Sequence, residues 1–175
     1  MDTKRIKGLQ VVTLAGTHVG AVDQIFFDPT TKHVAGFVLQ ADPTLPDTAQ
    51  RFVDVDNVHA LGADALTLPD AAAVHGPATS APLGGLVDRD DLAKRQVMTE
   101  GGAVLGQVAA VEVNPQTLAL ARIEVHAGFF TSNTWIAADQ VAQLGTDAIM
   151  VADATTVPEA AIALGETGSH PEATA

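Results

Sequence analysis

Residues 11–40 read VVTLAGTHVGAVDQIFFDPTTKHVAGFVLQ, and 86 positions later residues 97–126 read VMTEGGAVLGQVAAVEVNPQTLALARIEVH. The two stretches share a pair of glycines four residues apart (Gly16 and Gly20, Gly102 and Gly106), a proline after an acidic or amide residue, and the order of their apolar residues. After a loop that is three residues shorter in the second copy, FVDVDNVHALGADALTLPD (52–70) lies over WIAADQVAQLGTDAIMVAD (135–153). A repeat of this kind indicates two copies of one structural unit.

The apolar residues within each copy alternate as they do in β-strands. In HVAGFVLQ (33–40) and its counterpart ALARIEVH (119–126), every second residue is apolar, with Ala35 and Ala121 expected on the core face. The preceding strand loses the alternation once, at the same place in both copies. We expect a β-bulge there, because an extra residue bends a strand as a small closed barrel requires.

Turn residues and composition divide the chain into units. DPTTK (28–32) and NPQT (114–117) predict hairpin turns, and DRDDLAKR (88–95) predicts one helical turn capped by an acid. Each copy is small for an independent domain, so we expect the copies to pack as a pseudo-dimer. The expected organisation is repeat one at 1–70, an Ala-, Pro- and Gly-rich linker at 71–87, repeat two at 88–153 and a flexible tail at 154–175.

The ordered series of motifs resembles the PRC-barrel family. The motif residues are Gly16, Gly20, Val22, Asp28-Pro29, Val58, Leu61-Gly62 and Asp64-Ala65-Leu66, and the second copy repeats them with Asn114 in place of Asp28. The resemblance implies an all-β fold of two small PRC-type β-barrels in tandem. Relatives such as the cytoplasmic domain of the photosynthetic reaction centre H subunit and the C-terminal domain of the ribosome maturation factor dock onto larger assemblies. The family has no catalytic residue set, so the resemblance implies none here.

Composition argues against several classes of function. The chain has no cysteine and a net charge of -12, and Arg122 is the only basic residue after residue 95. An acidic surface repels nucleic acid and anionic lipid, although a small basic patch remains at Lys4, Arg5 and Lys7. With no apolar run of about 18 residues and no signal-like N-terminus, we expect a cytoplasmic protein without a membrane span.

The sequence carries no pattern of a catalytic, metal or cofactor site. The six histidines lack metal-ligand spacing, and the acidic stretches VDVDNV and DRDD lack the remainder of a calcium loop. There is no Gly-x-Ser-x-Gly, and a strand rather than a helix follows Gly16 and Gly20, so a phosphate loop is not expected. We therefore expect no catalytic residue, no metal and no cofactor.

The hairpin register predicts how the two copies differ outside. The predicted inner pairs are Ile25 with Phe37 and Phe27 with Ala35, and the predicted outer pair is Phe26 with Gly36. In the second copy the outer pair becomes Glu112 with Arg122, an opposite-charge pair that supports this register. Phe26, Gly36 and Val38 then form either an aromatic cover over a strand glycine or an interface patch.

Phe129 and Phe130 are the other candidate interface residues, whereas Trp135, aligned with Phe52, is expected to be structural. The expected function is a non-enzymatic protein-interaction adaptor with an unidentified protein partner, no direct nucleic acid contact and a possible homo-oligomeric state. One alternative is an accessory factor of a ribonucleoprotein assembly that acts through protein contacts. A second alternative is a small-ligand carrier, although barrels this small are normally filled by their own side chains.

Overall fold

The computed structural model describes residues 1–40, 51–76, 84–127 and 133–153. Phe129, Phe130 and the tail from residue 154 lie outside these ranges. The elements in chain order are α1 (Thr3–Ile6), β1 (Gln10–Thr13), β2 (His18–Phe27), β3 (Val34–Leu39), β4 (Arg51–Asp54), the 3₁₀-helix η1 (Val55–Asn57), β5 (Ala60–Leu61), β6 (Ala65–Leu68), the 3₁₀-helix η2 (Ala71–Ala73), β7 (Val87–Asp88), α2 (Arg89–Leu92), β8 (Gln96–Thr99), β9 (Val104–Val113), β10 (Leu120–His126), β11 (Thr134–Ala137), β12 (Val141–Leu144) and β13 (Ala148–Val151).

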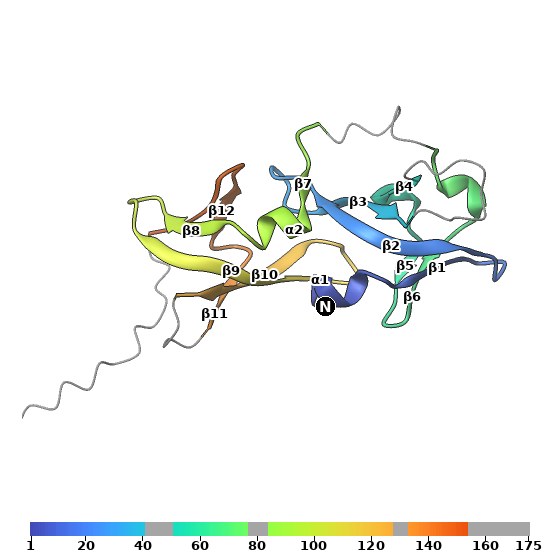
Figure 1. Ribbon diagram of the computed structural model, residues 1–175, viewed down its shortest axis with the longest axis horizontal. Coiled ribbons are helices and arrows are strands. Elements are labelled where there is room, and N and C mark those ends of the chain that lie inside the picture. Colours follow the sequence, from blue (N-terminus) through green and yellow to red (C-terminus); the bar gives the residue numbers. More distant parts are fainter. Residues whose placement is uncertain (41–50, 77–83, 128–132, 154–175) are drawn as a thin grey trace, which may run out of the picture.

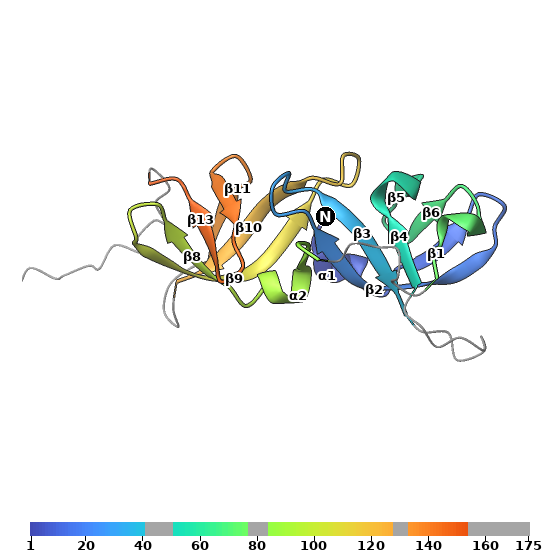
Figure 2. The ribbon, with the colours of Figure 1, turned by 90° about the horizontal axis from the view of Figure 1, so that it is seen from above.

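The predicted all-β fold of two tandem barrel units is confirmed. The first sheet has the strand order β4-β3-β2-β1-β6-β5, and the second has the matching order β11-β10-β9-β8-β13-β12. Both sheets curl, and they lie side by side along the long axis of the molecule (Figures 1 and 2). Strand β7, at the start of repeat two, adds to the first sheet by pairing with β2.

The predicted bulges are confirmed in both copies. The register of β2 with β3 shifts at Asp23, and the register of β9 with β10 shifts at Ala109. A second shared bulge was not expected. It leaves Ala35 without a partner in β2 and Ala121 without a partner in β9; Ala35 is half-buried and Ala121 is exposed.

This second bulge corrects the predicted register at one end of the hairpin. Ile25 pairs with Phe37 and Phe26 with Gly36, as expected, but Phe27 faces Val34 rather than Ala35. Val34 is fully buried and takes the core position that the alternation assigned to Ala35. The larger side chain buries more apolar area, so a bulge that turns the alanine outward and valine inward stabilises the fold.

The predicted hairpin turns at 28–32 and 114–117 form as expected, and a separate turn before β2 and before β9 needs glycine at specific places. Gly16 and Gly20 have positive φ values of 80° and 146°, and Gly102 and Gly106 repeat this with 88° and 145°. A Cβ on Gly106 would lie 2.8 Å from the carbonyl carbon of His126, so the position also requires a close backbone approach. The recurring Gly-x-x-x-Gly therefore belongs to the turn and bulged start of a barrel strand.

Each repeat packs a short helix on a strand of the other repeat. Helix α1 packs on β9 of repeat two, and α2 packs on β2 of repeat one. Asp2 and Asp88 cap these helices in the same way, and each continues into a bridge with the other repeat, Asp2 with Glu112 and Asp88 with Phe26. Helix α1 was not predicted. Its counterpart α2 was predicted. Extending the alignment upstream, so that Asp2 lies over Asp88, would have predicted α1 as well.

A pseudo-twofold axis passes between the two hairpin turns. His33 bridges to its own counterpart, Ala119, and the flanking hydrogen bonds are symmetric. Val34 N–H donates to Leu118 C=O and Leu120 N–H donates to Lys32 C=O, each at 2.8 Å. One continuous cluster of buried apolar residues runs through both repeats. The expected pseudo-dimer is thus held by backbone pairing as well as by burial of apolar surface.

No helix within the described ranges is long and apolar enough to cross a membrane.

Candidate interaction surfaces

The outer face of the hairpin in repeat one is covered by a ring of the same chain. Phe52 from β4 lies over Gly36, where an added Cβ would come within 2.8 Å of Cε1 and closer still to Cζ. Phe52 is 3% exposed, and Val38, its partner in the strand register, is 2% exposed. Phe26 is half-buried and pairs with Gly36 on one side and with Asp88 of β7 on the other.

The chain also closes the edge of this sheet itself. After β6 and η2, His75 exchanges two backbone hydrogen bonds with Phe52, at 3.1 and 2.8 Å. The ring Nε2 of His75 lies 3.4 Å from Oδ2 of Asp54, the residue after Val53 in β4. The first residues of the expected linker therefore pair with β4 through one β-bridge.

The equivalent face of repeat two is built from an ion pair and an exposed ring. Arg122 stands where repeat one has Gly36, and its Nε donates to Oε2 of Glu112 at 2.6 Å. The ring of Trp135, the counterpart of Phe52, stacks on this guanidinium with its centroid 4.1 Å from Cζ. Because a guanidinium lies under the ring where repeat one has no side chain, Trp135 stays 39% exposed.

The ion pair fixes the charge states of its members. The hydrogen bond from Arg122 lowers the pKa of Glu112, and the same hydrogen bond raises the pKa of Arg122. Both groups are therefore charged at neutral pH, and the guanidinium offers Trp135 a cationic platform held in one position.

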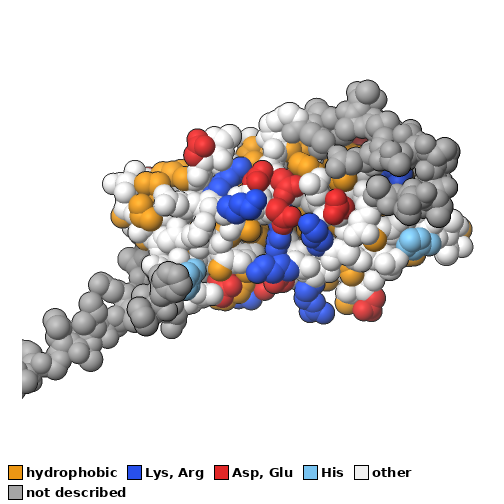
Figure 3. Space-filling view, viewed as in Figure 1, with side chains coloured by type: hydrophobic (Ala, Val, Ile, Leu, Met, Phe, Trp, Pro, Cys, Tyr) orange, Lys and Arg blue, Asp and Glu red, His pale blue; other side chains and the backbone are white. Residues whose placement is uncertain are grey.

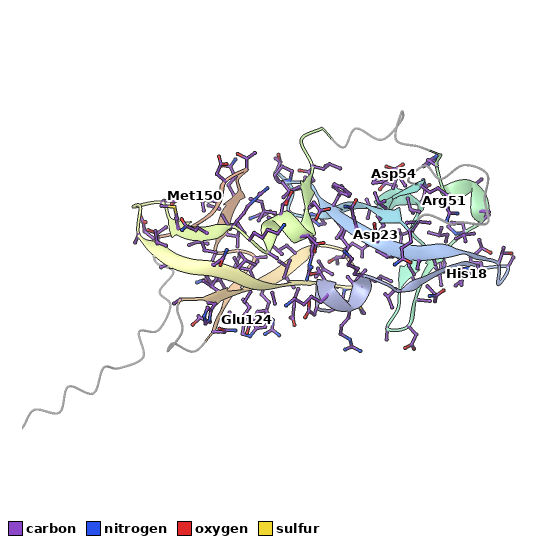
Figure 4. The ribbon with its side chains drawn as sticks, in the orientation of Figure 1. His18, Asp23, Arg51, Asp54, Glu124 and Met150 are labelled. Carbon is purple, nitrogen blue, oxygen red and sulfur yellow. The ribbon has the colours of Figure 1, made fainter. Side chains whose placement is uncertain are left out.

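A second carboxylate, Glu124, lies beside this stack. Glu124 pairs with Trp135 in the register of β10 and β11, and Asp139 follows β11 after one residue. Figure 4 places Glu124 beside β11, on the rim of repeat two. The acidic residues between positions 96 and 153 are Glu100, Glu112, Glu124, Asp139, Asp147 and Asp153, against the single base Arg122.

A second charged region lies between the repeats, where Figure 3 shows basic and acidic side chains gathered over α1 and α2. Lys7 forms an ion pair with Asp90 at 3.1 Å, and Lys4 Nζ donates to the carbonyl of Ala109 at 3.2 Å. Two members of the predicted basic patch therefore hold the repeats together.

Arg89 is the buried member of this region. Its Nε donates to Oγ1 of Thr3 at 2.9 Å, and it forms an ion pair with Asp90. Its Nη2 has no hydrogen-bond partner within the described part of the chain. Thr3 and Arg89 occupy equivalent positions, so this contact lies beside the pseudo-twofold axis.

Within residues 1–40, 51–76, 84–127 and 133–153, no group of three or more His, Asp or Glu residues could hold a metal ion.

The candidate interface residues thus differ in how exposed they are. Gly36 and Val38 lie beneath Phe52, Phe26 is partly open, and Phe129 and Phe130 fall outside the described residues. Trp135 was expected to be structural; it stacks on Arg122, and its ring is 39% exposed in the described part of repeat two. The signal for it was present in the alignment, because an arginine at the position of Gly36 leaves no room for a ring to lie flat on the sheet.

The family model of the PRC-barrel domain matches residues 1–70. No curated protein shows significant similarity to the chain.

Proposed function

Since residues 1–70 form a PRC-barrel domain, and residues 88–153 repeat its sequence pattern and strand order, we propose that the chain is a non-enzymatic adaptor. It docks a protein partner through the outer face of repeat two, and Trp135 is the central contact residue. The proposal assigns no catalytic residue, metal or cofactor.

The observation that carries this proposal is the exposed stack of Trp135 on Arg122. Tryptophan and arginine are the residue types most often found at the energetic centre of a protein interface. A ring and a guanidinium that are already ordered lose little freedom when a partner covers them. Repeat one has buried the corresponding ring, so the duplication has left one copy structural and the other with an open aromatic face.

The remainder of the architecture supports a docking role. The barrel interiors are filled by their own apolar side chains, and the symmetric contacts of α1 and α2 join the two repeats. Such a pair presents its outer faces at fixed positions, as an adaptor requires. The acidic surface argues for protein rather than nucleic acid as the direct partner.

The test is an affinity capture from native lysate with nuclease treatment, using the tagged full-length chain. Three baits are compared: the unaltered chain, Trp135→Ala, and Leu14→Ala as a matched control. Leu14 is a 61% exposed apolar residue in the turn after β1, away from the proposed face. Thermal unfolding of each bait verifies that it is folded.

We expect a defined protein to be retained by the unaltered chain and by Leu14→Ala and to be lost from folded Trp135→Ala. Equal capture by Trp135→Ala would move the docking site elsewhere and refute the proposal. Loss of every captured protein on nuclease treatment would instead indicate a nucleic-acid bridge.

A further inference from the structure

Strand β11 ends its sheet with backbone groups that point outward. Ala138 N–H donates to Ala121 C=O at 3.0 Å, so these two residues form a hydrogen-bonded pair across β10 and β11. Such pairs alternate with non-hydrogen-bonded pairs along an antiparallel ladder. The pair of Glu124 with Trp135 is therefore of the second kind, and the N–H and C=O of Trp135 point away from β10.

Repeat one shows that the equivalent strand edge can pair with a further backbone segment. Phe52 occupies the equivalent place in β4, and its N–H and C=O bond to His75, which forms an isolated β-bridge at this edge. Among the described residues, no strand lies beyond β11 in the second sheet. In the sequence, the residue that corresponds to His75 is Pro158, which has no N–H to donate.

The charges beside this edge select the occupant. Glu124 faces Trp135 across β10 and β11, Asp139 follows β11 in the chain, and Arg122 is already paired with Glu112. A strand added to β11 would place every second side chain on the outer face directly beside Trp135, with Glu124 one strand further in, on the other side of that ring. Lysine or arginine at those positions would lie against the aromatic ring and is long enough to extend over it toward the Glu124 carboxylate, and both groups attract cations.

Resting on the proposed function, we propose that the partner segment is an extended basic strand that pairs with the backbone of β11. Its outward residues are lysine or arginine, and its alternate residues are apolar and lie beside the end of the core near Ile136. The recognition is β-strand addition, in which the backbone gives affinity and the alternate side chains give specificity.

The chain provides its own reporter for this interaction. Trp135 is the only tryptophan, and there is no tyrosine. Fluorescence of the full-length protein therefore reports directly on the proposed edge. The probe is a short acetylated peptide in which lysine alternates with valine, and the controls are the same peptide with glutamate for lysine and with N-methylated lysine backbone positions.

We expect the lysine peptide to shift the emission saturably and to bind about tenfold more tightly than the glutamate peptide, because its outward cations lie against the ring of Trp135 and are attracted by the Glu124 carboxylate behind it. N-methylation should weaken binding by a similar factor, since it removes backbone hydrogen bonds. Glu124→Lys should reverse the preference between the lysine and glutamate peptides. Hydrogen exchange of the Trp135 amide should slow only when the lysine peptide is bound.

Equal binding of both peptides, or binding unaffected by N-methylation, overturns the proposal. So does slow exchange of the Trp135 amide in the free protein, because the edge is then already paired, and sedimentation would show whether a second copy occupies it. If the lysine peptide fails while Trp135-dependent capture of a protein succeeds, the docking function stands and only the partner chemistry is wrong. If Trp135→Ala captures the same proteins, the docking site itself is wrong.

Discussion

Gly36 lies in β3 directly beneath the ring of Phe52, and this contact decides which repeat has a closed face. A Cβ at Gly36 would lie 2.6 Å from the carbonyl oxygen of Val53 and 2.8 Å from Cε1 of Phe52. Neither distance is tolerated by real atoms, so Gly36→Ala must displace the ring, the strand or both. The surroundings are tightly packed, because Phe52 is 3% and Val38 2% exposed.

The expected cost follows from this overpacking. An extra methyl group in a filled site typically destabilises by about 1–3 kcal/mol. For a chain of this size that corresponds to a fall in Tm of roughly 2–12 °C. Phe52→Ala should cost more, about 3–5 kcal/mol, because it removes a buried ring and leaves a cavity.

A double-mutant cycle isolates the contact. Once Phe52 is alanine, the methyl group of Gly36→Ala meets only the Val53 carbonyl, so the double variant should be less destabilised than the sum of the single variants. The expected interaction energy is about 0.5–3 kcal/mol, as found for residues in contact. Urea unfolding of the four proteins measures it.

Gly76→Ala is the matched control, because nothing lies within 4 Å of a Cβ at Gly76. Its stability should change by less than about 0.5 kcal/mol. Additive effects of Gly36→Ala and Phe52→Ala, or a neutral Gly36→Ala, would refute the argument that the ring needs a glycine beneath it.

Three further substitutions test the turns, the caps and the joint between the repeats. Asp28 accepts backbone hydrogen bonds from Thr31 and Thr30, and these lower its pKa from the ordinary 3.8. The stability that the ionised carboxylate adds is therefore present above pH 3.8 and is lost as the pH falls through the pKa of Asp28 in the folded state. Asp28→Asn, which copies Asn114 of repeat two, should keep the turn and flatten the decline of Tm below pH 3.8. Burial raises the pKa of Asp88 from 3.8, so ionising Asp88 is less favourable in the folded state than in the unfolded state. The folded state therefore loses stability as the pH rises through the pKa of Asp88 in the folded protein. Asp88→Asn should keep the cap of α2 and should have a higher Tm than the unaltered chain at pH 7 but not below pH 3.8. Lys32 Nζ donates to the carbonyls of Val141 at 2.6 Å and Ala138 at 3.3 Å. Lys32→Met should therefore lower the free energy of unfolding, measured in urea, by about 1–3 kcal/mol. The control is Lys94→Met, at a side chain that is 76% exposed, which should leave the urea midpoint unchanged.

The local pattern of the chain was sufficient to predict the repeated unit and most of its elements. Alternation places strands, and the slip at residues 22–25 marks the first bulge, because a two-residue period can be lost only by an extra residue. Asp28-Pro29 and Gly16 mark turns through their own backbone preferences. The ion pair of Glu112 with Arg122 also followed from register alone. Each of these depends on neighbours that are near in sequence or fixed by hairpin geometry.

Contacts between segments distant in sequence decided the rest. Alternation assigned Ala35 to the core, but packing selected the larger Val34 and bulged the alanine outward. Two aligned aromatic residues differ in exposure: Phe52 lies over Gly36 and is buried, whereas Trp135 stacks on a guanidinium and remains 39% exposed. The sequence by itself determined a tandem barrel with an acidic second repeat. Only the tertiary structure decided which outer face is closed, because burial depends on what lies beneath and beside a side chain, and neither is encoded in the period of its own strand.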